Sequence, residues 1–165
     1  MAERFKKILV AIDFSSATDD VVAVASRFAE NYGAELQLIN VLEEGYALSG
    51  LDGMSLPFDD LATIQSFNDS RRRALQDKLA GLIDSLQKRG FQVTGRIIEG
   101  HPASMIVDES EQGGFDAVFV GSHGWSGIKK FLMGSVADSV VKNSSCSVMV
   151  VRGRKPLAEA STASV

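Results

Sequence analysis

The 165-residue chain has one cysteine, two histidines and no long apolar run. A lone Cys146 cannot form an intramolecular disulfide or a paired-cysteine metal clip, which excludes a disulfide-stapled secreted scaffold. No apolar run approaches the ~20 residues of a membrane-spanning helix, and the short run after Lys7 is too brief for a signal peptide. We therefore expect a soluble, cytoplasmic protein that does not insert into membranes.

The chain also lacks an excess of positive charge. It carries 17 Lys and Arg residues against 21 Asp and Glu residues, a formal net charge of −4. The field of such a molecule repels nucleic-acid backbones and anionic membranes, so we expect no nucleic-acid partner, and any bound phosphate must be held locally. The basic run Arg71–Arg73 is too short for a nucleic-acid footprint and is typical of the exposed side of a helix.

Several catalytic motifs are missing. The sequence has no G-x-x-x-x-G-K-[ST] loop, no G-x-G-x-x-G after its first apolar run, no H-E-x-x-H and no G-x-S-x-G, which removes the usual basis for P-loop, dinucleotide, metalloprotease and α/β-hydrolase chemistry. His101 and His123 have no carboxylate cluster around them, so no metal site is expected beyond Mg²⁺ carried by nucleotide phosphates. The length and the 45% apolar content suit one domain, residues 1–153, followed by a mobile tail, 154–165.

Apolar runs typical of buried parallel strands alternate with helical periodicity along the chain. Strands are predicted at 8–12, 36–41, 91–99, 116–120 and 147–152, and helices from Ser15, Ser16 or Thr18 as N-cap to Gly33, over 61–88, from Pro102 to Gly113, and over 135–143. The segment 43–60 has turn chemistry instead. This alternation predicts βαβ units and a parallel sheet with helices on both faces. Ligands of such sheets bind outside the carboxyl ends of the strands, here after Ile12 and Val120.

The segment from Gly121 to Val136 is unusually rich in glycine. Glycine permits positive φ and close backbone approach, so Gly121 and Gly124 are expected to turn the chain and direct N–H groups into an anion-binding concavity. Gly134 and Ser135 then open a helix whose free N–H groups favour a phosphate. The alternative is that these glycines only connect a strand to a helix.

Asp13 directly follows the first predicted strand. In a doubly wound sheet the fourth strand commonly neighbours the first, which brings Asp13 beside the glycine-rich segment, where its carboxylate can accept hydrogen bonds from ribose hydroxyls. The alternative is a carboxylate that caps the following helix. His123 likewise has two interpretations, a contact to a terminal phosphate or a neutral structural role.

The pattern G-x2-G-x9-G-[ST], filled by Gly121, Gly124, Gly134 and Ser135, resembles the ATP-binding signature of the universal stress protein family. The resemblance extends to the segments 7–15, 39–41 and 147–151 and so covers roughly residues 5–152. It implies a three-layer, doubly wound α/β fold of the adenine nucleotide alpha hydrolase-like type, with a five-stranded parallel sheet of strand order 3-2-1-4-5.

The resemblance also implies a site for ATP or AMP. Carried over position by position, it assigns the base and ribose to Ala11, Ile12, Asp13 and Val41, and the phosphates to Gly121, Ser122, His123, Gly124, Gly134, Ser135 and Val136. It further implies a homodimer formed through the last strand, with Val148, Val150 and Val151 as interface candidates, which would cover an exposed sheet edge.

The favoured function is therefore an adenine-nucleotide-binding regulatory protein of the stress response, a ligand-sensing dimer that signals to a regulatory protein partner. One alternative is a slow ATPase or autokinase, for which the sequence offers no obvious base beyond Asp13, Ser122 and His123. Another is a dimeric interaction protein that does not use nucleotide. The sequence alone does not choose between ATP and AMP.

Overall fold

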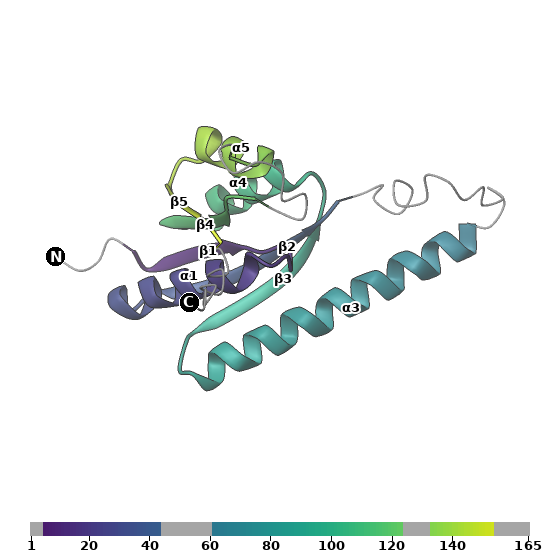
Figure 1. Ribbon diagram of the computed structural model, residues 1–165, viewed down its shortest axis with the longest axis horizontal. Coiled ribbons are helices and arrows are strands. Elements are labelled where there is room, and N and C mark those ends of the chain that lie inside the picture. The colour runs from purple at the N-terminus through teal and green to yellow at the C-terminus, as the bar shows by residue number, and fades with distance from the viewer. Residues whose placement is uncertain (1–4, 44–60, 124–132, 154–165) are drawn as a thin grey trace, which may run out of the picture.

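The computed structural model describes residues 5–43, 61–123 and 133–153, and these residues form a five-stranded sheet in which every neighbouring pair of strands is parallel (Figure 1). The strands are β1 (Lys7–Ala11), β2 (Glu35–Leu42), β3 (Val93–Glu99), β4 (Ala117–Gly121) and β5 (Ser147–Val151), in the spatial order β3-β2-β1-β4-β5. The predicted strand order 3-2-1-4-5 is thus confirmed, with strand bounds shifted by one or two residues. The predictions for 44–60 and for the tail 154–165 lie outside the described residues.

Helices cover both faces of the sheet. They are α1 (Thr18–Tyr32), α3 (Leu61–Lys88), α4 (Pro102–Gln112) and α5 (Ser135–Asn143). In Figure 1, α1 and α3 lie on one side of the strands and α4 and α5 on the other, which gives the expected three layers. The first half of α3 extends past the carboxyl edge of the sheet, and its side chains from 65 to 70 are exposed.

The central strand β1 is buried on both faces because each face meets a helical layer. Ile8 and Val10 pack toward α1 and α3, whereas Leu9 packs toward α4 and α5, and all three side chains are fully buried. Alternate residues of a strand point to opposite faces, so a strand between two helical layers needs apolar residues at every position. The unbroken apolar run near the start of the chain follows from this requirement.

Two helix boundaries follow the predicted signals. Gly33 ends α1 in the left-handed conformation, with φ of 65°, which glycine adopts without steric cost. Pro102 occupies the first turn of α4, where its missing N–H would have had no partner.

The predicted N-cap of α1 is wrong. The N-cap residue is Ala17, and no side chain caps the helix, whereas the sequence favoured Ser15, Ser16 or Thr18. The Ser15 hydroxyl instead accepts a hydrogen bond from the Ala17 N–H at 3.3 Å. The reason is that Asp13 organises this turn from the end of β1, as described below.

Cys146 is half-buried beside the cluster of apolar residues beneath α4 and α5. Burial raises the pKa of its thiol, and a hydrogen bond with Ser110 opposes that rise only in part. A thiol of raised pKa stays protonated near neutral pH and is a poor nucleophile. This agrees with Cys146 acting as a small apolar group.

Helix α3 packs closely on β3 because Gly95 has no side chain. A β-carbon at Gly95 would lie 2.8 Å from the Ile83 Cδ1 atom and 3.1 Å from the Leu79 Cδ1 atom. Leu79 is buried, and Ile83 packs against the same core. The absence of a side chain at Gly95 is therefore what allows α3 to lie so close to β3.

We predict that Gly95→Val lowers the free energy of unfolding by about 1–3 kcal/mol, the usual cost of overpacking, measured by urea denaturation. The matched control is Gly81→Val on α3, where an added β-carbon would meet no neighbouring atom within 4 Å. The control should leave stability unchanged or slightly raise it, since glycine is a poor helix former. Equal stability of Gly95→Val and the unsubstituted protein would contradict this account of the packing.

Candidate functional site

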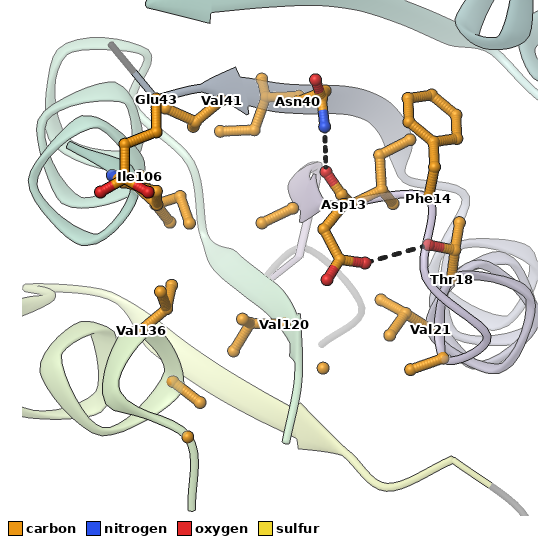
Figure 2. A pocket seen from close by; sticks show the side chains of 18 of the residues that line it. Asp13, Phe14, Thr18, Val21, Asn40, Val41, Glu43, Ile106, Val120 and Val136 are labelled. Atoms are coloured by element: carbon orange, nitrogen blue, oxygen red, sulfur yellow. Dashed lines mark hydrogen bonds between the residues drawn. The ribbon is translucent and has the colours of Figure 1, made fainter. Parts of the chain in front are cut away.

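A cleft of about 540 Å³ lies at the carboxyl edge of the sheet, where β1 and β4 are neighbours and the strand order reverses (Figure 2). Every predicted nucleotide-binding residue within the described ranges lines this cleft: Ala11, Ile12, Asp13, Val41, Gly121, Ser122, His123, Gly134, Ser135 and Val136. The remaining one, Gly124, lies outside the described residues. The cleft therefore collects residues from four separate segments at the place where parallel α/β sheets bind ligands.

Asp13 holds the turn between β1 and α1. Its Oδ1 atom accepts a hydrogen bond from the Ser15 N–H at 2.9 Å and lies 3.4 Å from the Thr18 hydroxyl oxygen (Figure 2). Asp13 therefore stabilises the turn that leads into α1. This is close to the helix-capping alternative considered from the sequence, although the N-cap residue itself is Ala17. A carboxylate has about four acceptor positions on two oxygens, so this role is compatible with ligand binding at the cleft.

Asn40 on β2 also lines the cleft, and the sequence analysis did not select it. The residue is 5% exposed, and its Nδ2 atom donates a hydrogen bond of 2.9 Å to the Ile12 carbonyl. Its Oδ1 atom is buried and has no hydrogen-bond partner among the residues that the structure describes, and Figure 2 shows this oxygen on the side of the amide away from β1. The available signal was an amide inside the apolar run of β2, which also contains the amide of Gln37.

Phe14 is a second residue that the sequence analysis missed. Its φ of 58° makes it the one non-glycine residue with positive φ among the described ranges, and its side chain lines the cleft. Such a conformation is rare for a bulky side chain and costs of order 1–3 kcal/mol. The Lys78 Nζ atom of α3 lies 5.9 Å from the centroid of the Phe14 ring, so α3 also reaches this edge.

The amino end of α5 opens onto the cleft without a side-chain cap. The Gly134 N–H donates to the Ser122 carbonyl at 2.8 Å, and the first helical bond runs from the Asp138 N–H to the Gly134 carbonyl. The N–H groups of Ser135, Val136 and Ala137 thus have no partner within the helix. Such an end carries partial positive charge and binds anions.

The expected positive φ is not observed at the described glycines of this segment. Gly121 ends β4 and Gly134 has φ of −63° and ψ of 153°, which any residue can adopt. Close approach explains Gly134 instead, because a β-carbon there would lie 3.1 Å from the Ser122 carbonyl oxygen. This glycine lets the start of α5 lie directly against the end of β4.

His123 is held by its neighbour. Its Nδ1 atom lies 3.0 Å from the Ser122 hydroxyl oxygen, whereas its Nε2 atom is buried and has no hydrogen-bond partner within the described ranges. A buried polar atom without a partner costs about 1–3 kcal/mol. His123 and Asn40 therefore each bring one unsatisfied polar atom to the walls of the same cleft.

Two carboxylates and two cationic side chains line the cleft: Asp13, Glu43, Arg71 and Lys78. In the part of the chain that the structure describes, no three His, Cys, Asp or Glu side chains lie together as metal ligands. No described helix is both long enough and apolar enough to cross a membrane. The cleft thus offers hydrogen-bonding groups and balanced charge.

The model of the universal stress protein family matches residues 4–152. The chain belongs to the universal stress protein family. Universal stress protein MJ0577 of Methanocaldococcus jannaschii is 27% identical over 92% of this chain and 98% of its own length, and its solved structure superposes with a TM-score of 0.77 over 93% of this chain and 99% of its own. Universal stress protein YxiE of Bacillus subtilis is 29% identical over 90% of this chain and 99% of its own length.

More distant members have been solved with nucleotides. A universal stress protein in complex with cAMP is 20% identical, with a TM-score of 0.60 over 91% of this chain and 98% of its own. The Archaeoglobus fulgidus universal stress protein in complex with dAMP is 17% identical, with a TM-score of 0.58 over 89% of this chain and 98% of its own. At these identities the two structures establish only that the fold is shared.

We predict that Asp13→Ala lowers the free energy of unfolding by about 1 kcal/mol, because the Ser15 N–H loses its acceptor. Asp13→Asn should cost less, since an amide oxygen can still accept that bond. Urea denaturation measures both, with Asp108→Ala on the exposed side of α4 as a control that stays within about 0.5 kcal/mol of the unsubstituted protein. Equal losses for the three variants would argue against the structural role of Asp13.

Proposed function

We propose that the protein binds an adenine nucleotide in this cleft and works as a ligand-sensing regulatory module. The phosphates would lie at the uncapped amino end of α5, against Gly134 and Ser135, and the ribose would meet Asp13. The base would lie near Val41, whose side chain packs toward α4. The observation that carries the proposal is the convergence of the motif residues around one cleft that contains a free helix amino end.

Two further facts support nucleotide binding. Among the described residues no side chain caps the amino end of α5, and its N-cap residue, Gly134, has none to offer, which suits a phosphate. The ligands named for two structurally similar family members, cAMP and dAMP, are both adenine nucleotides. Both point to the adenine nucleotide class without deciding the number of phosphates or a need for Mg²⁺.

Binding rather than turnover is the main function in this proposal. A general base must reach the attacking water or hydroxyl within hydrogen-bond distance. Asp13 Oδ1 and His123 Nδ1 already have partners within the protein, so the ATPase alternative would need the second oxygen of Asp13 or His123 Nε2. Nucleotide binding would instead act by raising the stability of the folded protein. A ligand a hundredfold above its dissociation constant stabilises the folded state by about 2.7 kcal/mol. Phosphate release in proportion to protein, lost in Asp13→Asn, would favour the ATPase alternative.

We predict that saturating ATP or AMP raises the melting temperature and that Gly134→Val abolishes this rise. The added side chain would push the start of α5 away from the Ser122 carbonyl and displace the N–H groups that bind phosphate. Differential scanning fluorimetry measures the rise in melting temperature. Gly134→Ala places a smaller side chain at the same position.

The control for this experiment is Gly81→Val on α3, which is not among the residues that line the cleft and should retain the full nucleotide-dependent shift. Circular dichroism checks that the Gly134 variants remain folded. An unchanged melting temperature of the unsubstituted protein with either nucleotide, or a full shift in Gly134→Val, would argue against the proposed site.

We further propose that two copies pair through β5. This strand bonds only to β4 among the described strands, so its outer edge offers unpaired backbone groups. Met149 is 41% exposed, and Val148 and Val150 are partly buried, whereas Val151 is buried under α1. The apolar side chains available to a second copy are therefore Val148, Met149 and Val150, with Val151 serving the core.

We predict that Met149→Lys shifts the protein toward monomers, because pairing would bury or oppose the new charges of both copies. Sedimentation velocity measures the molecular mass. Thr94→Lys on the opposite edge strand β3, where the side chain is also exposed, is the matched control and should not change the mass. If only Thr94→Lys shifted the protein toward monomers, the contact between copies would lie at the β3 edge of the sheet instead.

A further inference from the structure

Strands β1 and β2 part beside the cleft. Their register ends at Ala11 and Ile39, and the last backbone bond between them among the described residues runs from the Ile12 N–H to the Ile39 carbonyl, at 2.9 Å. Strand β2 continues to Leu42 and stays paired with β3 over this length. The end of β2 therefore has a partner strand on one side only, and Val41 in this part lines the cleft.

The backbone groups of Val41 face the side of β2 that β1 has left. Along a parallel strand, alternate residues direct their N–H and C=O groups to opposite neighbours. The Ile39 carbonyl bonds Ile12 on the β1 side, whereas the Leu42 carbonyl accepts a bond from the Gly100 N–H on the β3 side. Val41 shares the orientation of Ile39, and neither its N–H nor its C=O has a bonding partner among the described residues.

Asn40 occupies the acceptor that Val41 would otherwise use. In a continued ladder the Val41 N–H would donate to the Ile12 carbonyl, but the Asn40 Nδ2 atom donates to it instead, at 2.9 Å (Figure 2). The Asn40 Oδ1 atom gains no bond in return within the described ranges. A buried acceptor without a partner lowers stability, so packing of the core does not by itself explain an amide at this position.

An N–H and a C=O on the same side of a strand match one edge of a purine base. Adenine has an acceptor nitrogen beside an amino group, so it can accept from the Val41 N–H and donate to the Val41 carbonyl. Hypoxanthine has an N–H beside a carbonyl oxygen, the reverse order, which would set donor against donor and acceptor against acceptor. A site built for one order rejects the other because its own polar groups would be left unpaired.

We propose that Asn40 sets the base selectivity of the site. By bonding the Ile12 carbonyl it ends the β1–β2 ladder and leaves the Val41 N–H and C=O free for the base. Asn40 touches no ligand in this arrangement, so it is a positioning residue that acts through Val41. The inference rests on the proposed nucleotide binding and adds to it the means by which an amino-bearing purine is distinguished from an oxo-bearing one.

Isothermal titration calorimetry of the full chain with ATP and ITP tests the inference, because these two nucleotides differ only in the base. We expect the unsubstituted protein to bind ATP about 10- to 100-fold more tightly than ITP, the range for one two-point contact to a base edge. Asn40→Leu should remove most of this preference, since the Ile12 carbonyl then becomes available to the Val41 N–H. Asn40→Ala, which cannot overpack the core, should lose the preference likewise.

Gln37→Leu is the matched control. Gln37 is the other amide of β2, its Nε2 atom donates to the Glu109 Oε1 atom at 2.9 Å, and it is not among the residues that line the cleft. This variant should keep the full preference for ATP. Circular dichroism checks that all three variants are folded.

The outcomes separate the two proposals. Equal affinities of the unsubstituted protein for ATP and ITP, or a full preference for ATP in both Asn40 variants, would overturn the role of Asn40 and leave nucleotide binding intact. Equal weakening of both nucleotides in the Asn40 variants would indicate a structural role alone and would also overturn it. Binding of neither nucleotide by the unsubstituted protein would overturn the proposed function itself.

Discussion

The pairing of β1 with β4 is the constraint on which the rest of the site depends. Ile8, Leu9 and Val10 lie in register with Ala117, Val118 and Phe119, although more than a hundred residues of chain separate the two strands. Strands β2 and β3 lie on the β1 side of this pair, and β5 lies on the β4 side. The carboxyl ends of β1 and β4 lie side by side where the strand order reverses, and both Asp13 and Ser122 line the cleft there.

Burial is the main constraint on the register of β1 and β4, and at the start of the pair Asp116 Oδ2 also accepts hydrogen bonds from the N–H groups of Lys6 and Lys7. The side chains of Leu9 and Val118 are fully buried on the α4 and α5 face, and Phe119 is buried on the other. Because side chains alternate between faces, a shift by one residue would exchange the two sets and expose or overpack each layer. Packing of the apolar core thus sets the register of β1 and β4 and, with it, the positions of the residues that follow these strands in the cleft. The polar groups of the cleft need not specify the fold.

The fold could be predicted from the sequence because its signals are local. Continuous apolar runs indicate buried parallel strands, and Gly33 and Pro102 mark helix boundaries by their own backbone chemistry. Asn40 and Phe14 could not be selected in this way. Asn40 is one of two amides in a mostly apolar strand, and its importance comes from the carbonyl of Ile12, which lies just past the end of the neighbouring strand β1. The positive φ of Phe14 has no sequence signal, since glycine or asparagine would be expected there.

Three of the unsatisfied or strained groups among the described residues lie at the cleft and on separate segments: Phe14, Asn40 and His123. The unpartnered hydroxyls of Ser26 and Ser144 lie outside the cleft lining. The combined cost of the three cleft groups must be offset by the core, which spans both faces of the sheet, and a protein of net negative charge gains no general attraction for phosphate to compensate. Local dipoles and a few cations must then supply the attraction. A cleft that holds strained or unsatisfied groups beside the uncapped amino end of α5 has the properties expected of a binding site, because strain of this kind collects at functional sites and the helix end attracts anions.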